Sequence, residues 1–454
     1  MLGIDEHTNE QNNKQRFEVV GVEDADKICK DIWNIANNHE KVSHNILKDE
    51  DVQVVNTEGK DVVIIRVPRA DYSIRPIYIN NNLSRGAFKR NHEGDYHCTE
   101  QEVRMMLRDA NESGNDGLFL EYYTMDDIDI PTLESYRVMF RTLQPEHIWN
   151  GLEHKEFLRQ LGGYTINRKD KSEGLTLAGL LMFGKGLPVR ERFDNLRMDY
   201  IDKSHLVGDQ RYSDRLTYDG MWENNLFNFM RLVMPKITRD LPKPFQMQGI
   251  VRVDDTLQHK AVREAVTNMV IHADFMLNGL IRIEKFDDRI VLTNPGLLKL
   301  PLDQIYRGGE SKARNQRMQN MLRMIGFGEN LGSGFPLILH AWDEKHWIKP
   351  ELVEQPELMQ VKLTLHIINE PVSDPVNGPD EPINGPINET LTGRQKAILE
   401  MMKERPSITR EELIESLGLS LATLKREIAA LRANGFISRE GSRKNGAWIT
   451  CKPE

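Results

Sequence analysis

The clearest helical pattern of apolar and polar positions lies in the stretch 263–275. Glu264, Asn268 and His272 stand four residues apart, so a helix would place them one above the other on a single face. Beside them runs an apolar stripe at helical spacing, formed by Val262, Val266, Met269, Val270 and Ala273. The pattern predicts one helix with a buried stripe next to a polar one.

Strand and turn signals follow this helix. Leu280–Lys285 and Arg289–Thr293 alternate like two strands joined by a tight turn, and the turn signal at 294–296 ends them. The glycine-rich stretch 326–335 comes next, and a helix is predicted from Phe335 to Trp342. Glycines before a helix let backbone amides approach a phosphate group.

The polar stripe suits nucleotide chemistry. A carboxylate such as Glu264 can orient or deprotonate water, while the amide oxygen of Asn268 can coordinate a hard cation such as Mg²⁺. For the helix taken alone, a half-exposed surface with a solvated face explains the same residues.

This order of elements resembles the Bergerat-type ATP-binding fold of gyrase, certain heat-shock chaperones, histidine kinases and MutL. More narrowly, residues 249–365 resemble the "RecG C-terminal-like" domain of many bacterial ATP-binding regulators. By position, the resemblance implies that Glu264 activates water and that Asn268 is the Mg²⁺ ligand. It also implies an adenine-reading box with Asn294 and Gly296 and a second glycine box with Gly332 and Gly334.

The resemblance extends to the end of the helix and to the ATP lid. His272 and Asp274 match the His-x-Asp-Tyr ending of the related regulators, and the lid would contain Arg314 and Asn315. His272 has two interpretations: it positions the lid, or it is a helix C-terminal residue that interacts favourably with the helix dipole.

Two positions depart from the family. Asn294 stands where the family at large has Asp, and Leu298 replaces a glycine. A neutral acceptor would therefore meet the adenine amino group, and the sequence leaves open whether ATP is bound or hydrolysed.

Residues 1–98 predict a partial α/β module. Arg16–Gly21, Asp61–Val67 and Arg75–Asn80 read as strands, and Asp24–Asn37 reads as an amphipathic helix. The arrangement resembles the second half of the Schlafen-type AlbA-like domain, which is associated with nucleic-acid binding. The first part of that domain is expected to be missing, because the matching sequence starts directly after Met1. A basic turn with Arg85, Lys89 and Arg90 would contact phosphates or would be a solvated turn.

Residues 99–248 predict a helical connecting region. Thr99 with Glu102 forms a capping box, and helices are expected at Pro131–Arg141, at His154–Leu161 and from Asn225. The apolar run Leu175–Phe183 should pack in a core. After the candidate nucleotide domain, residues 369–391 contain five prolines and predict an extended linker.

Residues 392–454 predict a winged helix. Capping boxes start two helices at Thr392 and Thr409, Ser420 can cap a third, and a hairpin follows from Phe436. The third helix would lie in the DNA major groove and the hairpin tip would reach the backbone. The residues expected to contact DNA are Ser420, Thr423, Lys425, Arg426, Arg443 and Lys444. Winged helices also dock proteins, which is the alternative.

Composition and charge narrow the choice of partner. A chain of 454 residues allows about three domains, and the sequence has 39% hydrophobic residues but no apolar run long enough to span a membrane. Three scattered cysteines predict a reducing cytoplasm and neither a disulfide framework nor a zinc site. The segment 392–454 has 12 basic and 8 acidic residues, net +4, although the whole chain carries −9. This local reversal favours DNA as its partner.

Together these features predict an α+β multidomain protein: a partial AlbA-like module, a Bergerat-like (GHKL) domain at 249–368 and a C-terminal winged helix. The function they favour is a cytoplasmic transcriptional regulator that binds ATP, Mg²⁺ and DNA and couples them through local concentration or homodimerisation. Two alternatives remain: an ATPase that processes nucleic acid in repair or defence, and a DNA-binding scaffold whose nucleotide site has decayed.

Overall fold

A computed structural model describes most of the chain, in two compact units, Met1–Val372 and Ser373–Glu454. The described residues of the first unit are 1–9, 14–91, 94–111, 114–241, 247–248, 251–252, 256–277, 279–328 and 334–368. In the second unit they are 393–406, 408–417, 424, 428, 431–432, 436–440 and 447–450. Each unit has its own hydrophobic core and is described by itself.

A six-stranded mixed sheet forms the centre of the first unit, with the strand order β10-β9-β13-β14-β16-β15. The strands are β9 (Arg197–Asp202), β10 (Asp214–Leu216), β13 (Leu280–Lys285), β14 (Arg289–Pro295), β15 (Glu351–Gln355) and β16 (Gln360–His366). The β9–β13 pair is parallel and the other pairs are antiparallel. The hairpin predicted at residues 280–293 is confirmed, whereas β9 and β10 were not predicted from the connecting region.

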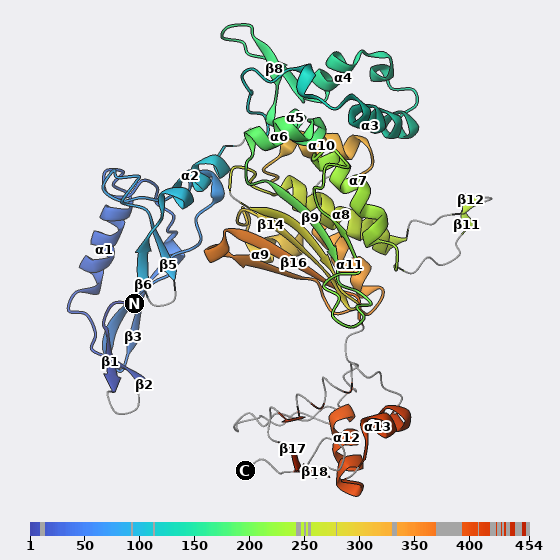
Figure 1. Ribbon diagram of the computed structural model, residues 1–454. Coiled ribbons are helices and arrows are strands. Elements are labelled where there is room, and N and C mark those ends of the chain that lie inside the picture. The colour runs from blue at the N-terminus through green and yellow to red at the C-terminus, as the bar shows by residue number, and fades with distance from the viewer. Residues whose placement is uncertain are drawn as a thin grey trace. The chain divides into compact units, whose positions relative to one another are not determined.

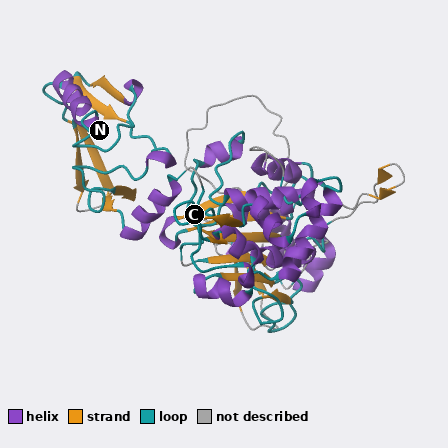
Figure 2. Cartoon of the chain, turned by 90° about the horizontal axis from the view of Figure 1, so that it is seen from above, coloured by secondary structure: helices purple, strands orange, loops and turns teal. Residues whose placement is uncertain are grey.

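Helices cover one face of this sheet (Figures 1 and 2). They are α7 (Leu226–Ile237), α8 (Leu257–Ile271), α10 (Gln316–Met324) and α11 (Gly334–Asp343). The predicted apolar stripe of α8 is buried and packs into the main core. The helix begins at Thr256, whose side chain caps it, and His272 is its C-cap, so it starts and ends earlier than the sequence pattern indicated.

Short helices carry the chain from the N-terminal region to the sheet. They are α2 (Glu100–Asp109), α3 (Ile130–Leu143), α4 (His154–Gln160), α5 (Leu177–Phe183) and α6 (Gly186–Arg192), with a two-stranded ribbon of β7 (Tyr164–Ile166) and β8 (Glu173–Leu175). The predicted capping box of Thr99 and Glu102 is present in full. All seven residues of α5 are buried, so the run 175–183 is core as predicted.

The N-terminal module consists of two-stranded ribbons and one helix. Its elements are β1 (Ile4–Asn9), β2 (Lys14–Val19), α1 (Ala25–Ala36), β3 (Val52–Thr57), β4 (Lys60–Ile65), β5 (Phe88–Asn91) and β6 (Gly94–His97). The predicted helix α1 is confirmed, with Asp24 as its N-cap. The strand predicted at Arg75–Asn80 is wrong, because this segment forms only isolated bridges to two different segments, through Tyr78 and Ile79.

The described part of the second unit agrees with a winged helix. It contains α12 (Gly393–Glu404), α13 (Arg410–Leu417), β17 (Ile437–Glu440) and β18 (Ala447–Thr450). Thr409 and Glu412 form the predicted capping box at the start of α13. The predicted core is confirmed at Ile398, Leu413, Leu424, Ile428 and Leu431, which are buried together with Trp448.

The first unit also contains two short elements not yet described. They are the ribbon of β11 (Met247–Gln248) and β12 (Val251–Arg252) and the helix α9 (Leu302–Arg307).

Candidate nucleotide-binding site

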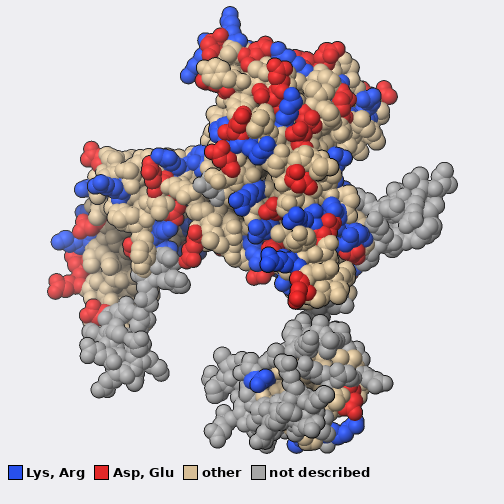
Figure 3. Space-filling view, in the orientation of Figure 1, with Lys and Arg blue, Asp and Glu red and all other residues tan. Residues whose placement is uncertain are grey.

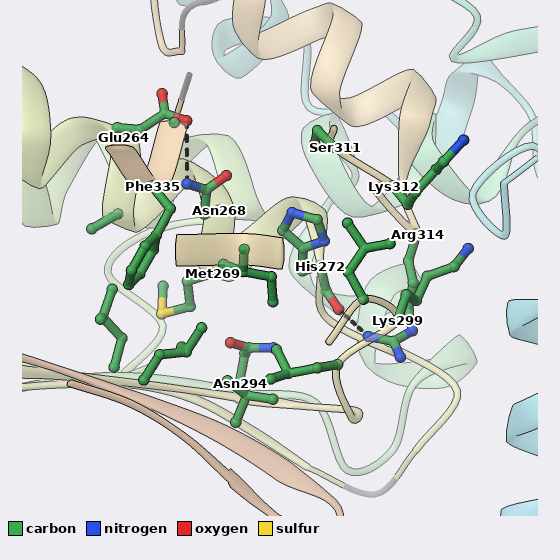
Figure 4. A pocket seen from close by; sticks show the side chains of 18 of the residues that line it. Glu264, Asn268, Met269, His272, Asn294, Lys299, Ser311, Lys312, Arg314 and Phe335 are labelled. Atoms are coloured by element: carbon green, nitrogen blue, oxygen red, sulfur yellow. Dashed lines mark hydrogen bonds between the residues drawn. The ribbon is translucent and has the colours of Figure 1, made fainter. Parts of the chain in front are cut away.

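A pocket lies between α8, the sheet and the segment that follows β14 (Figure 4). Residues 297–315, called the rim segment below, contribute many of its lining side chains, and α11 closes it with Gly334, Phe335 and Pro336. The empty volume is about 1080 Å³, part of it open to solvent.

One end of the pocket holds the predicted carboxylate and amide. Asn268 Nδ2 donates to Glu264 Oε1 at 3.2 Å, and Glu264 is buried at 6% exposure. The bond turns the Asn268 carbonyl oxygen away from Glu264 (Figure 4), and this oxygen accepts no side-chain or backbone hydrogen bond from a described residue. A Cβ built on Gly334 would overlap Glu264 Oε1, and one on Gly328 would lie 3.7 Å from Oε2. Gly334 therefore lets the backbone approach this pair closely, whereas the distance at Gly328 is an ordinary contact.

The floor of the pocket is apolar apart from one amide. Leu292, Val361 and Leu363 project from the sheet around Asn294, which is 8% exposed. Asn294 Nδ2 donates to the carbonyl of Pro295 at 3.3 Å. Among the described residues, its oxygen accepts no hydrogen bond, so Asn294 offers the pocket a hydrogen-bond acceptor. Gly296, with a φ of +104°, turns the chain directly after the strand.

His272 lies at the C-terminal end of α8 and lines the same pocket (Figure 4). Burial lowers its pKa to about 4, and the neighbouring cations Arg314 and Lys299 add to the shift. The ring is therefore neutral near pH 7. His272 is the C-cap of α8, at the helix end where both interpretations put it, and a neutral imidazole brings no charge to the helix dipole.

The predicted lid residues Arg314 and Asn315 are fixed to the body of the domain. Arg314 donates to both carboxylate oxygens of Asp109, at 2.6 and 2.7 Å, and to the carbonyls of His272 and Leu297. Asn315 Nδ2 donates to two carbonyls at the end of α8, at 3.1 and 2.8 Å. Arg314 lines the pocket, whereas the side-chain amide of Asn315 is directed to α8.

Asp274 lies just after the C-cap of α8 and forms an ion pair with Arg108. It is 2% exposed, accepts from Arg108 Nη2 at 2.7 Å and accepts the backbone amide of Met276 at 3.0 Å. The carboxylate thus faces a cation from α2. Asp274 is not among the residues that line the pocket.

Several residues of the site were not predicted. Lys299 and Lys312 line the pocket on the side remote from Glu264 (Figure 4), and Lys299 lies 4.4 Å from the ring of Tyr72. Burial lowers the pKa of Lys299, and Arg314 and Lys312 act in the same direction. No local sequence pattern marks Asp109 or Tyr72, because each contacts a pocket residue, Arg314 or Lys299, from a distant part of the chain.

Two of the three basic residues predicted in the basic turn form ion pairs. Lys89 and Arg90 lie on β5, where Lys89 meets Glu102 at 2.5 Å and Arg90 meets Asp95 at 3.2 Å. Arg85 is exposed in the preceding turn. Figure 3 shows acidic and basic side chains interspersed over the visible face of the described residues. Nothing in this view marks a broad basic face.

Other predicted residues lie outside the part of the chain that the structure describes. They are Gly332 of the second glycine box and the DNA-contact candidates Ser420, Thr423, Lys425, Arg426, Arg443 and Lys444. Among the described residues, no group of three or more His, Cys, Asp or Glu side chains is arranged to hold a metal ion. No described helix is long and apolar enough to cross a membrane.

Comparison with protein families places two of the predicted regions. Residues 279–364 match the model described as "Putative ATP-dependent DNA helicase recG C-terminal", and residues 394–446 match the model described as "HTH domain". The chain carries a RecG C-terminal-like domain followed by a helix-turn-helix domain. The first covers β13, β14, the rim segment and most of the pocket floor.

Further comparisons add little. Residues 104–199 match a domain of unknown function (DUF8451). No curated protein matched the chain. A similar solved structure is that of the DIP2311 protein from Corynebacterium diphtheriae, with 17% identity and a TM-score of 0.40 over 98% of this chain and 70% of that one.

Proposed function

We propose that this protein is a nucleotide-responsive transcriptional regulator, in which the RecG C-terminal-like domain binds ATP with Mg²⁺ and the helix-turn-helix domain binds DNA. The observation that carries the proposal is the hydrogen-bonded pair of buried Glu264 and half-buried Asn268 at one end of the pocket, closed by Gly334 at the start of α11. A helix N-terminus with close backbone approach favours phosphate.

The residues present fit a Mg²⁺ ion that arrives with the nucleotide. Asn268 offers one oxygen ligand beside a carboxylate, and Mg²⁺ commonly completes its shell with phosphate oxygens and water. When bound, the ion would neutralise phosphate charge. In this arrangement Asn294 accepts from the base, and the apolar side chains around it exclude water.

The test is equilibrium binding of a fluorescent ATP analogue with Mg²⁺ to the full chain. Asn268→Ala should abolish saturable binding, while Asn56→Ala, an exposed amide on β3, should leave it unchanged. Absence of saturable binding to the parent at millimolar nucleotide would overturn the proposal and favour a scaffold with a decayed site.

Coupling to DNA is tested on the same preparation. ATP should change either the oligomeric state or the affinity for DNA, because bringing two DNA readers to two half-sites raises avidity without new contacts. Sedimentation velocity measures the oligomeric state and DNA titration measures the affinity, each with and without Mg-ATP. Unchanged values in both would refute the coupling while leaving nucleotide binding intact.

Hydrolysis is the second candidate, favoured by the position of the Glu264 carboxylate directly beside Asn268. In that case Glu264 would hold and deprotonate the attacking water. Glu264→Gln should then abolish phosphate release while nucleotide binding persists. An equal rate in parent and variant would remove Glu264 from that role.

A further inference from the structure

The rim segment is held from outside the RecG C-terminal-like domain at both of its ends. Asp109, in the last turn of α2, binds Arg314 through two hydrogen bonds of 2.6 and 2.7 Å. The backbone amide of Asn115 donates to the carbonyl of Arg314 at 2.8 Å. These contacts fix the far end of the segment, next to α10.

The near end is held by the N-terminal module. Arg69 Nη2 donates to the carbonyl of Leu298 at 2.9 Å and lies 3.6 Å from Glu354, which itself accepts the amide of Leu298 at 2.7 Å. Tyr72, in the short turn of 3₁₀ helix Tyr72–Ile74, presents its ring to the ammonium of Lys299. Leu298 and Lys299 both line the pocket.

The middle of the rim segment is less constrained. The helix α9 has no buried residue, and Gly308 and Gly309 follow it with positive φ values of +75° and +96°. One internal anchor is present, where Tyr306 donates to the carbonyl of Pro350 at 3.1 Å. A ligand in the pocket therefore contacts a segment whose two ends are held by the N-terminal module and by α2.

We propose that Arg69, Tyr72 and Asp109 are positioning residues for the pocket, so that nucleotide binding and the seating of the N-terminal module on the rim segment strengthen each other. The inference rests on the proposed nucleotide site. Its basis is thermodynamic reciprocity: if seated contacts preorganise the pocket, an occupied pocket stabilises those contacts by the same factor.

The first test is amide hydrogen exchange of the full chain with and without Mg-ATP. Occupancy should slow exchange at residues 66–75, because a segment whose contacts are stabilised opens less often, and Asn268→Ala should show no such change. If the parent binds nucleotide but exchange at 66–75 stays the same, the inference is overturned. If the parent binds no nucleotide at all, the proposed function fails first.

The second test removes the contacts from the N-terminal side. Arg69→Gln with Tyr72→Leu should weaken Mg-ATP binding about fivefold or more and abolish the slowing at 66–75. Lys30→Gln with Tyr96→Leu likewise removes one positive charge and one phenol ring, at exposed positions of the same module, and should change neither. Equal nucleotide affinity in the two double variants would sink the inference. If Tyr72→Leu unfolds the N-terminal module, the hydrogen-exchange comparison of the parent with and without Mg-ATP still tests the inference.

Discussion

Burial sets the charge of His272 before any ligand arrives. Its ring lies between α8 and the rim segment, with Arg314 and Lys299 nearby, and its pKa falls to about 4. An ordinary histidine has a pKa near 6.5. The folded protein therefore binds fewer protons here than the unfolded chain at pH values between these two.

This difference predicts a pH dependence of stability. As the pH falls from 6.5 to 4, His272 becomes protonated in the unfolded chain but stays neutral in the folded protein. The contribution of His272 to the free energy of unfolding therefore decreases, by at most about 3 kcal/mol. Below pH 4 the loss is complete. Urea titrations of the parent and of His272→Gln across this range measure it, since the other histidines cancel in the difference. A difference that stays constant with pH would contradict the shift.

Gly334 gives a steric prediction at the same scale. An alanine there would place its Cβ on the carboxylate of Glu264 and push this side chain away from its position beside Asn268. Gly334→Ala should therefore weaken Mg-ATP binding by about tenfold or more. Gly151→Ala is the control, because nothing lies within 4 Å of its Cβ. Parent-like affinity in Gly334→Ala would show that the pair tolerates displacement.

At the scale of elements, the sequence pattern predicted correctly those features that depend on interactions between residues close together in the chain. The stripe of α8, the hairpin β13–β14 and the capping boxes of Thr99 and Thr409 all depend on residues a few positions apart. The strand expected at 75–80 failed because its partners, at Val42 and Ala87, come from two different segments, a fact that alternation alone does not reveal.

In the site, too, some residues could be predicted from local sequence and others could not. Glu264, Asn268 and Asn294 follow from spacing and resemblance, and they line one pocket. Asp109 and Arg69 did not follow, since they are 205 and 229 residues from their partners in the sequence. Long-range pairs of this kind become visible only when the fold brings α2 and the N-terminal module to the rim segment.

The close packing of α5 leads to a prediction about stability. A Cβ on Gly179 would overlap the carbonyl of Gly163, in the buried turn before β7. Backbone cannot yield as a flexible side chain can, so Gly179→Ala should lower the free energy of unfolding by about 1–3 kcal/mol or more. Thermal unfolding of this variant beside Gly151→Ala measures the effect. Equal unfolding temperatures would mean that α5 can shift without loss.

For the whole molecule, charge is divided unequally along the chain. Residues 392–454 carry a net +4 and the remainder −13. An acidic body repels the DNA backbone while a basic helix-turn-helix domain attracts it, so binding should depend on that domain and on salt. The two units have separate cores, and a change in one should leave the other folded.

The last prediction uses this separation. Lys425→Gln with Arg426→Gln should weaken DNA binding by the full chain and reduce the slope of log affinity against log salt by about one or two, because each lost phosphate contact releases about 0.9 fewer counterions. The control Lys30→Gln with Arg85→Gln removes two charges from the N-terminal module and should leave the slope unchanged. Nucleotide binding should be the same in all three proteins. If the control variant lost the salt dependence instead, DNA would be held by the N-terminal module and the helix-turn-helix domain would be left to dock a protein.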